Sequence, residues 1–323
     1  MKTKPKKFDL ITIGDAAWDV FMKIHNADKR CSKNHQDCVL CLDYGGKIGV
    51  DQLHSSVGGN AANIAVASSK LGINTAFVGF IGSDDIGKKA LKIIKQLSVD
   101  TQYAISSGLT NQSSIICFQD ERTILSYKEK RDYKLSKLPE SDWLFITSTG
   151  PGSEKFIPEI ICKAKERKIV YNPGSYHMQH GPNFLTKIIK KAYCLIVNLE
   201  EAWKIINKKP NDIKETLYDL SRLGPEIVVV TNGKEGAYVS QNNKNYRISS
   251  IKVKVVDPTG AGDSFSAAFV CALIYNKTVK EALLWGILNS TSLIQKLGTE
   301  QGLLDKKQLQ NKLKNVNPQA IEF

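Results

Sequence analysis

The sequence of 323 residues predicts an α/β fold, a doubly wound sheet sandwiched by helices with a small β-sheet lid. Hydrophobic residues make up 42% and charged residues 24% of the chain, which are ordinary globular values. Short apolar segments alternate with helical patterns, and this alternation is typical of a mostly parallel sheet covered on both faces. Two stretches with a period of two interrupt the alternation and predict the lid. We expect a single domain over residues 1–323.

The first predicted strand is the apolar run Phe8 to Gly14. A buried strand there delivers Asp15 and Asp19 to its carboxyl end, where α/β sheets place their sites. The small residues of positions 60–71 predict a helix, which leads into a strand at residues 74–80.

The lid is predicted from about residues 17–57 and 100–130. Its β-rich parts are Cys38 to Val57 and Thr101 to Tyr127, and the second contains a turn at residues 119–122. The open edges of such a sheet need cover, so a homodimer formed through the lid is a further expectation.

After Asp142 the strands and helices alternate regularly. Strands are expected at residues 143–147, 168–172, 193–197 and 226–231, and helices at 153–167, 183–190, 199–206 and 211–223. A hairpin that turns at Asn242–Asn243 joins residues 235–240 to 246–256, and two long helices follow at 260–275 and 279–297.

The net charge of +13 is compatible with a polyanionic partner only if the positive residues cluster. They do not cluster in the sequence, and only six are arginine, the side chain that grips phosphate with two hydrogen bonds. No segment approaches the ~18 apolar residues of a membrane helix. We therefore expect a cytoplasmic protein with neither nucleic acid nor membrane as a partner.

Seven cysteines, an odd number in a chain expected to be cytoplasmic, predict reduced thiols rather than disulfides. Cys31, His35, Cys38 and Cys41 nevertheless combine into a set that could hold zinc in a tetrahedron. The alternative is that the thiols pack as small hydrophobic groups. Because the chain has no second C-x-x-C pair, structural Zn²⁺ is not expected.

The strongest local motif is V-D-P-T-G-A-G-D-S-F at residues 256–265, where a strand ends and an apolar helix begins. Glycines there let backbone N–H groups converge on an anion, and the helix N-terminus adds positive potential. Asp263, in the first helical turn, could accept a proton from a hydroxyl that attacks phosphorus. The alternative is a glycine-rich turn in which Asp263 only complements the helix end.

The motif at residues 257–265 resembles the second signature of the ribokinase-like carbohydrate kinases, the PfkB family. The segments G-G-N-A-A-N-I-A at 58–65 and V-G-F-I-G-S-D-D-I-G at 78–87 resemble the N-terminal signature of that family. N-L-E-E at 198–201 and T-N-G-K-E-G-A at 231–237 are similar to two further motifs. The resemblance spans residues 8–300 and implies a ribokinase-like fold.

On this resemblance, one group of residues handles the transferred phosphoryl group. Asp263 is implied as the catalytic base, with a nest for the phosphoryl group at Gly260, Ala261 and Gly262. Asn198 and Glu201 are implied in the Mg²⁺ shell through water, because Mg²⁺ keeps much of its hydration.

A second group of residues is implied to bind the substrates and a monovalent cation. ATP is assigned to Thr231, Gly233 and Gly236, with Asn289 near the adenine, and the hydroxyls of the acceptor to Asp19, Gly59 and Asn63. Asp257 is the implied support of a monovalent cation such as K⁺.

Several of these residues also have a purely structural interpretation. Asp19 could be a surface turn residue, and Asn63 is a polar residue in an otherwise apolar helix that needs a partner. Asn198 and Glu201 have the spacing of a capping box. Residues 82–89 match part of a P-loop, but Lys89 stands where a metal-binding Ser or Thr is required.

The predicted function is ATP-dependent phosphorylation of a primary hydroxyl of a small sugar, with a nucleoside kinase as the alternative. A catalytically silent binding protein is the remote alternative, which the intact Asp263 disfavours. We rank a neutral hexose or pentose first, a nucleoside second and a sugar phosphate third. A nucleoside base could stack on Trp18 or Tyr44, and a phosphate would need Arg122 or Arg131.

Overall fold

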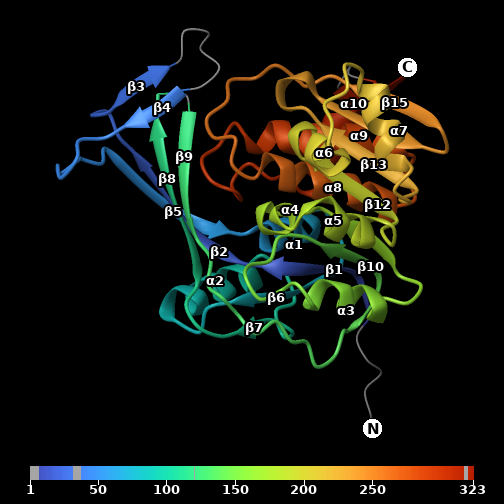
Figure 1. The fold of residues 1–323 in the computed structure, drawn as a ribbon, viewed down its shortest axis with the longest axis horizontal. Coiled ribbons are helices and arrows are strands. Elements are labelled where there is room, and N and C mark those ends of the chain that lie inside the picture. The colour runs from blue at the N-terminus through green and yellow to red at the C-terminus, as the bar shows by residue number, and fades with distance from the viewer. Residues whose placement is uncertain (1–6, 32–37, 120, 316–318) are drawn as a thin grey trace.

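The computed structural model describes residues 7–31, 38–119, 121–315 and 319–323. It shows one large sheet between two layers of helices, with a smaller sheet standing beside it (Figure 1). The predicted sandwich with a separate lid sheet is confirmed. No helix among the described residues is long and apolar enough to cross a membrane.

The large sheet has the strand order β16-β15-β14-β13-β12-β11-β10-β1-β6-β7 in the described part of the chain. Its strands from β13 to β7 are parallel, and β14, β15 and β16 form an antiparallel edge. The bounds are β1 Lys7–Asp15, β6 Thr75–Ile81, β7 Ile105–Ser106, β10 Glu140–Ile146, β11 Lys168–Tyr171, β12 Cys194–Asn198, β13 Ile227–Thr231, β14 Ala237–Gln241, β15 Lys244–Ile248 and β16 Ile321–Glu322.

Helices cover both faces of this sheet, each over its own apolar core. One face is covered by α1 Asn60–Lys70, α2 Asp85–Gln96, α8 Ala261–Ile274, α9 Val279–Leu293 and α10 Lys306–Asn315. The other is covered by α3 Phe156–Lys163, α4 Ser175–Gln179, α5 Gly181–Ile189, α6 Leu199–Ile206 and α7 Ile213–Ser221. Covering both faces explains continuous apolar runs such as Ile227 to Val230, all fully buried.

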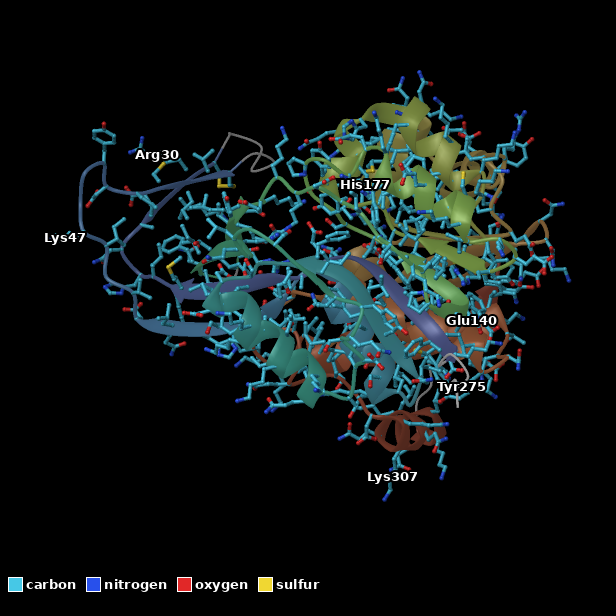
Figure 2. The ribbon with its side chains drawn as sticks, turned by 90° about the horizontal axis from the view of Figure 1, so that it is seen from below. Arg30, Lys47, Glu140, His177, Tyr275 and Lys307 are labelled. Carbon is cyan, nitrogen blue, oxygen red and sulfur yellow. A yellow bond between two sulfur atoms is a disulfide. The ribbon has the colours of Figure 1, made fainter. Side chains whose placement is uncertain are left out.

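The lid is a sheet of four strands in the order β5-β2-β8-β9. Its strands are β2 Ala17–Lys23, β5 Gln52–Gly58, β8 Asn111–Phe118 and β9 Glu121–Tyr127, which fall within the predicted lid segments. A hairpin of β3 Asp28–Cys31 and β4 Cys38–Cys41 projects beyond this sheet, and Arg30 marks its position in Figure 2.

The expectation of reduced thiols throughout is wrong for two cysteines, because Cys31 and Cys38 form a disulfide. They are directly paired across β3 and β4, and this register brings their sulfurs together. Sulfurs joined in this way cannot act as zinc thiolates. His35 lies outside the described residues, and no group of three metal-ligating side chains occurs within the described ranges.

Some element boundaries also differ from the prediction. The hairpin after β13 ends at Ile248 rather than Val256, and residues 249–260 form a loop in which Val255 and Val256 are exposed. Helices α2, α4 and α10 were not predicted. The sequence does contain a start signal for α2, because Asp84 is a typical N-cap residue and its side chain accepts a hydrogen bond from the Gly87 N–H.

Candidate active site

A cavity of about 580 Å³ lies between the lid and the large sheet. It collects residues from β1, β2, α1, α6, β8, β9 and the loop that opens α8. All residues implied for catalysis and acceptor binding line it, together with Glu201 from the implied Mg²⁺ shell; the first set is Asp19, Gly59, Asn63, Gly260, Ala261, Gly262 and Asp263. Segments distant in sequence therefore meet at one site, at the carboxyl end of β1.

The predicted anion nest is the start of α8. Gly260 is its N-cap with a φ of 76°, in the left-handed region that favours glycine. The Ala261 N–H donates to the Pro258 carbonyl oxygen at 3.2 Å, whereas the next two N–H groups, of Gly262 and Asp263, have no partner within the helix. Because Ala261, Gly262 and Asp263 line the cavity, the positive end of the helix is directed at any anion bound there.

Asp263 is partly buried in the first turn of α8. Burial raises the pKa of its carboxyl group to about 6, and the negative charges of Asp19 and Glu201 act in the same direction. Asn63 opposes this shift, since its Nδ2 donates a hydrogen bond of 2.8 Å to Oδ2 of Asp263. A carboxylate with a pKa near 6 is ionised at neutral pH and is suited to act as a general base. The partner that Asn63 needs in α1 is thus Asp263.

Asp19 occupies the acceptor side of the cavity, where it is 6% exposed. Burial raises the pKa of its carboxyl group to about 6, although a hydrogen bond from Ser113 lowers it. The strand register places Asp19 opposite Ser113 and Ser113 opposite Ser126, so the three residues form a row across the lid. The interpretation of Asp19 as a surface turn residue is therefore wrong.

Gly59 lets the chain before α1 pass close to the backbone of Asp15 and Ala16. Its φ is 89°, and a Cβ atom at this position would lie 2.5 Å from the carbonyl oxygen of Asp15. Only glycine satisfies both conditions, which explains the Gly-Gly-Asn sequence before α1.

Sequence reasoning missed the role of Asp15, which lines the cavity and is 6% exposed. Its Oδ2 accepts hydrogen bonds from Asn111 Nδ2, at 3.0 Å, and from the Tyr133 hydroxyl, at 2.8 Å. Its Oδ1 has no hydrogen-bond partner among the described residues. Burial raises the pKa of this carboxyl group to about 6. The position of Asp15 at a strand end was visible in the sequence, but its partners come from distant segments.

Asn198 and Glu201 form a capping box at the start of α6. Asn198 Oδ1 accepts from the Glu201 N–H at 2.8 Å, and Glu201 Oε2 accepts from the Asn198 N–H at 3.0 Å. Glu201 also lines the cavity, and burial raises the pKa of its carboxyl group. The structural interpretation is confirmed and leaves Glu201 Oε1 available. The Glu201 carboxylate, which shares the cavity with the start of α8, fits a hydrated Mg²⁺ ion, whereas Asn198 does not line the cavity and its Oδ1 serves the cap.

Asp257 is 5% exposed and ties the loop before α8 to the loop after α9. Its Oδ1 accepts from the Thr259 N–H and its Oδ2 from the Gly298 N–H, both at 2.9 Å. The hydroxyl of Thr259 is buried without a hydrogen-bond partner in the described part of the chain. An unpaired oxygen beside a carboxylate fits the predicted monovalent cation.

The remaining predicted residues do not line this cavity. Thr231, Gly233 and Gly236 lie at the end of β13 and in the turn that follows. Asn289 is fully buried, where its Nδ2 donates to the Ser264 carbonyl and its Oδ1 accepts from the Leu304 N–H. Its side chain therefore connects α9 to α8 and to the segment before α10.

Of the side chains considered for stacking on a nucleoside base or for binding a phosphate, only Arg122 lines the cavity. Trp18 is 7% exposed and lies under the Lys89 ammonium group, whereas Tyr44 is fully exposed. Arg131 is buried and donates to the carbonyls of Ser107 and Leu109. Arg122 lines the cavity.

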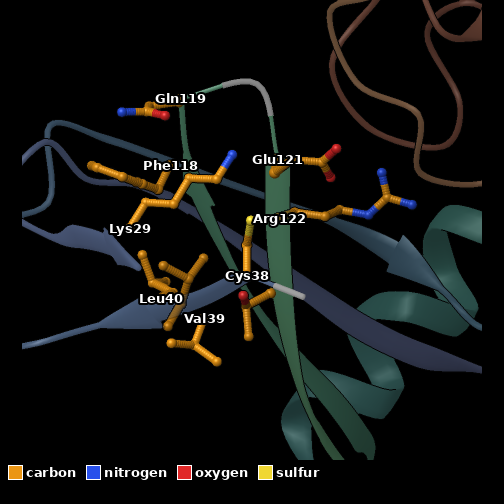
Figure 3. Close-up of a pocket in the computed structure, with 10 residues that line it drawn as sticks. Lys29, Cys38, Val39, Leu40, Phe118, Gln119, Glu121 and Arg122 are labelled. Atoms are coloured by element: carbon orange, nitrogen blue, oxygen red, sulfur yellow. The ribbon is translucent and has the colours of Figure 1, made fainter. Parts of the chain in front are cut away.

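A neighbouring cavity lies between hairpin β3–β4 and the lid strands β8 and β9 (Figure 3). It contains none of the predicted catalytic residues. Arg122 belongs to its wall as well, with Lys29 and Leu40 on the hairpin side.

Comparison with known proteins identifies the relatives of this chain. The model of the pfkB family carbohydrate kinases matches residues 31–306. An ATP-dependent 6-phosphofructokinase of Thermoanaerobacterium thermosaccharolyticum is 25% identical, with 93% of this chain and 92% of that protein covered. A ribokinase of Haemophilus influenzae is 27% identical, covering 76% of this chain and 83% of its own.

Among solved structures, the nucleoside kinase of Methanocaldococcus jannaschii superposes with a TM-score of 0.78 and 21% identity. That match covers 95% of this chain and 99% of the other. The ribokinase of Arabidopsis thaliana complexed with ribose and ATP has a TM-score of 0.79 and 20% identity over 96% of this chain and 100% of its own.

Proposed function

Because this chain belongs to the pfkB family of carbohydrate kinases, we propose that it transfers the γ-phosphoryl group of ATP to a primary hydroxyl of a small neutral sugar. The observation that carries this proposal is the position of Asp263. Its carboxyl group, with a pKa of about 6, lies beside the α8 nest and in the same cavity as Asp19. A base, an anion site and a hydroxyl-binding site thus share one space.

In the proposed reaction, Asp263 accepts the proton of the attacking hydroxyl while that oxygen forms a bond to the γ-phosphorus. The bond between the γ-phosphorus and the bridging oxygen breaks, and ADP leaves. The hydrogen bond from Asn63 orients the Asp263 carboxylate. N–H groups at the start of α8 stabilise the charge on the phosphoryl oxygens. Mg²⁺, held through water by Asn198 and Glu201, would neutralise phosphate charge when bound.

A neutral acceptor is supported by the polar groups of the cavity. Asp15 and Asp19 each present a buried carboxylate, and Ser113 and Ser126 add hydroxyls on the lid. This arrangement suits the neighbouring hydroxyl groups of a sugar. Carboxylates so close to the acceptor repel a second negative group, so a sugar phosphate remains the third choice.

A nucleoside remains the second choice. The two predicted stacking residues, Trp18 and Tyr44, do not line the cavity, whereas Tyr127 does. The family relatives and structural neighbours include proteins named as ribokinases and as nucleoside kinases. We further propose that the lid closes over the acceptor and excludes water, which would otherwise compete for the phosphoryl group.

An acceptor panel tests the proposal. ADP release with ATP and Mg²⁺ is measured for fructose, ribose, 2-keto-3-deoxygluconate, adenosine, cytidine and fructose phosphates, with Asp263→Asn as the background control. We expect the highest kcat/KM with a neutral hexose or pentose. A nucleoside that exceeds every sugar by more than ~10-fold, about 1.4 kcal/mol in transition-state binding, would reject the neutral sugar. No turnover with any acceptor would reject the proposed reaction.

A further inference from the structure

Arg122, the second residue of lid strand β9, faces the loop that opens α8. It lines the candidate active-site cavity together with Pro258 and Gly260. It also lines an adjoining cavity with Val256 and Asp257. Figure 3 shows its side chain extending away from hairpin β3–β4, in the direction of the C-terminal part of the chain, drawn in brown. The lid therefore directs the guanidinium group toward the start of α8, where the predicted anion nest lies.

Arg122 and the predicted acceptor-binding residues lie at different positions along strand β9. Arg122, Ile124 and Ser126 alternate along the strand, and all three line the cavity. Ser126 belongs to the row that Asp19 and Ser113 form across the lid. Arg122 precedes Ser126 by four residues, which separates the two positions by about 13 Å along β9. A sugar held at the row leaves Arg122 free for a group bound beyond it.

The charges of the cavity point to an anion at this position. Among the described residues that line it, the positive side chains are Arg122 and Lys128. Lys128 lies at the other end of β9, where its Nζ donates to Ser175 Oγ at 3.2 Å. Arg122 makes no ion pair with any described residue, so its charge is available to a ligand. The α8 nest supplies N–H donors for a phosphate but no full positive charge of its own.

We propose that Arg122 is a phosphate-binding residue that completes the α8 anion site from the lid; this inference rests on the proposed kinase function. A guanidinium group can donate two parallel hydrogen bonds to one phosphate, which a lysine cannot do. The phosphate belongs either to the nucleotide or to a phosphorylated sugar. Both present a tetrahedral anion, and the experiment separates the two sources.

The experiment compares Arg122→Gln and Arg122→Lys with the wild type, and Arg30→Gln serves as the matched control. Arg30 is exposed on β3 (Figure 2) and lines neither the candidate active-site cavity nor the adjoining cavity beside Asp257. Its replacement therefore removes the same charge from the lid region without changing the proposed phosphate site. Calorimetry measures the binding of ADP with Mg²⁺, of adenosine and of fructose 6-phosphate. Turnover with ATP is measured with the best neutral acceptor and with fructose 6-phosphate.

If the phosphate is that of the nucleotide, Arg122→Gln should weaken ADP binding or lower kcat/KM for ATP by about 10- to 100-fold, the scale of hydrogen bonds to charged groups. Adenosine binding should not change, and Arg122→Lys should recover part of the loss. If the phosphate is that of a sugar, the loss should appear only with fructose 6-phosphate. Changes within about twofold of the Arg30→Gln control in both arms would overturn the inference.

The binding arm also separates this inference from the proposed function. A wild-type protein that phosphorylates no acceptor yet loses ADP affinity in Arg122→Gln would reject the reaction and support the phosphate site. A wild-type protein that binds neither ADP nor fructose 6-phosphate would overturn the phosphate site itself. Thermal melting of each variant verifies that the lid change leaves the fold intact.

Discussion

Replacing Asp263 with asparagine should remove most of the turnover and, at the same time, stabilise the fold. Burial raises the pKa of this carboxyl group from 3.8 to about 6, which means that the folded state binds its proton more tightly than the unfolded state. The folded protein is therefore penalised for ionising Asp263 as the pH rises through this range. Asparagine keeps the shape and can still accept the Asn63 hydrogen bond, but it carries no charge.

The pKa difference gives the size of the effect. A shift of roughly two pKa units corresponds to about 3 kcal/mol of unfolding free energy at pH 8, as an upper limit because Asp263 is partly exposed and solvent screens its charge. Below the unfolded pKa both states are protonated and the penalty vanishes. At pH 5 the gain from Asp263→Asn should have fallen to about half of its value at pH 8.

The assay is urea unfolding of the wild type and Asp263→Asn at both pH values. Asp132→Asn is the control, since Asp132 is exposed and the same charge is removed there outside the cavity. In parallel, kcat should fall by roughly 10²-fold or more, because the amide cannot take the proton. The wild-type kcat/KM should itself fall below about pH 6, as the base becomes protonated. An equal stability gain at pH 5 and pH 8, or turnover within a few-fold of the wild type, would refute this account of Asp263.

Three other predictions concern the metal ions and the cysteines. Glu201→Gln should raise the Mg²⁺ concentration needed for half-maximal activity with little change in acceptor KM, and superimposable Mg²⁺ titrations would remove Glu201 from the metal shell. K⁺ should support a higher rate than Na⁺ at equal ionic strength, whereas equal rates would argue against a cation site at Asp257. Protein denatured without reductant should show free thiols at five of its seven cysteines and at all seven after reduction; seven from the start would contradict the Cys31–Cys38 bond.

Features that depend on neighbours in the chain could be predicted from the sequence alone. Helix α6 begins and ends at the predicted residues because its start is a local capping box of Asn198 and Glu201. The nest at Gly260 was predictable for the same reason, since a glycine-rich turn before an apolar helix creates an anion site within a few residues. The lid strands followed from their alternating pattern and the turn between them.

Only the tertiary structure decided which distant residues meet. Asp15 takes Asn111 and Tyr133 as partners across the fold, and Asn63 reaches Asp263 over 200 positions of the chain. No local pattern specifies such contacts, because they depend on how the sheet, lid and helices pack.

The same limit explains why the disulfide between Cys31 and Cys38 could not be predicted. Pairing Cys31 with Cys38 depends on the register of a hairpin, and a shift of one residue would turn the two side chains to opposite faces. The hydrogen bonds of Asn289 to Ser264 and Leu304 likewise form only after α8 and α9 have packed, and its place near the adenine stays a prediction. The sequence by itself determined the fold class and the glycine-rich start of α8, and it predicted Asp263 as the base. The buried carboxylates, the disulfide and the direction of Arg122 were decided by packing, which places groups from separate segments within reach of one another.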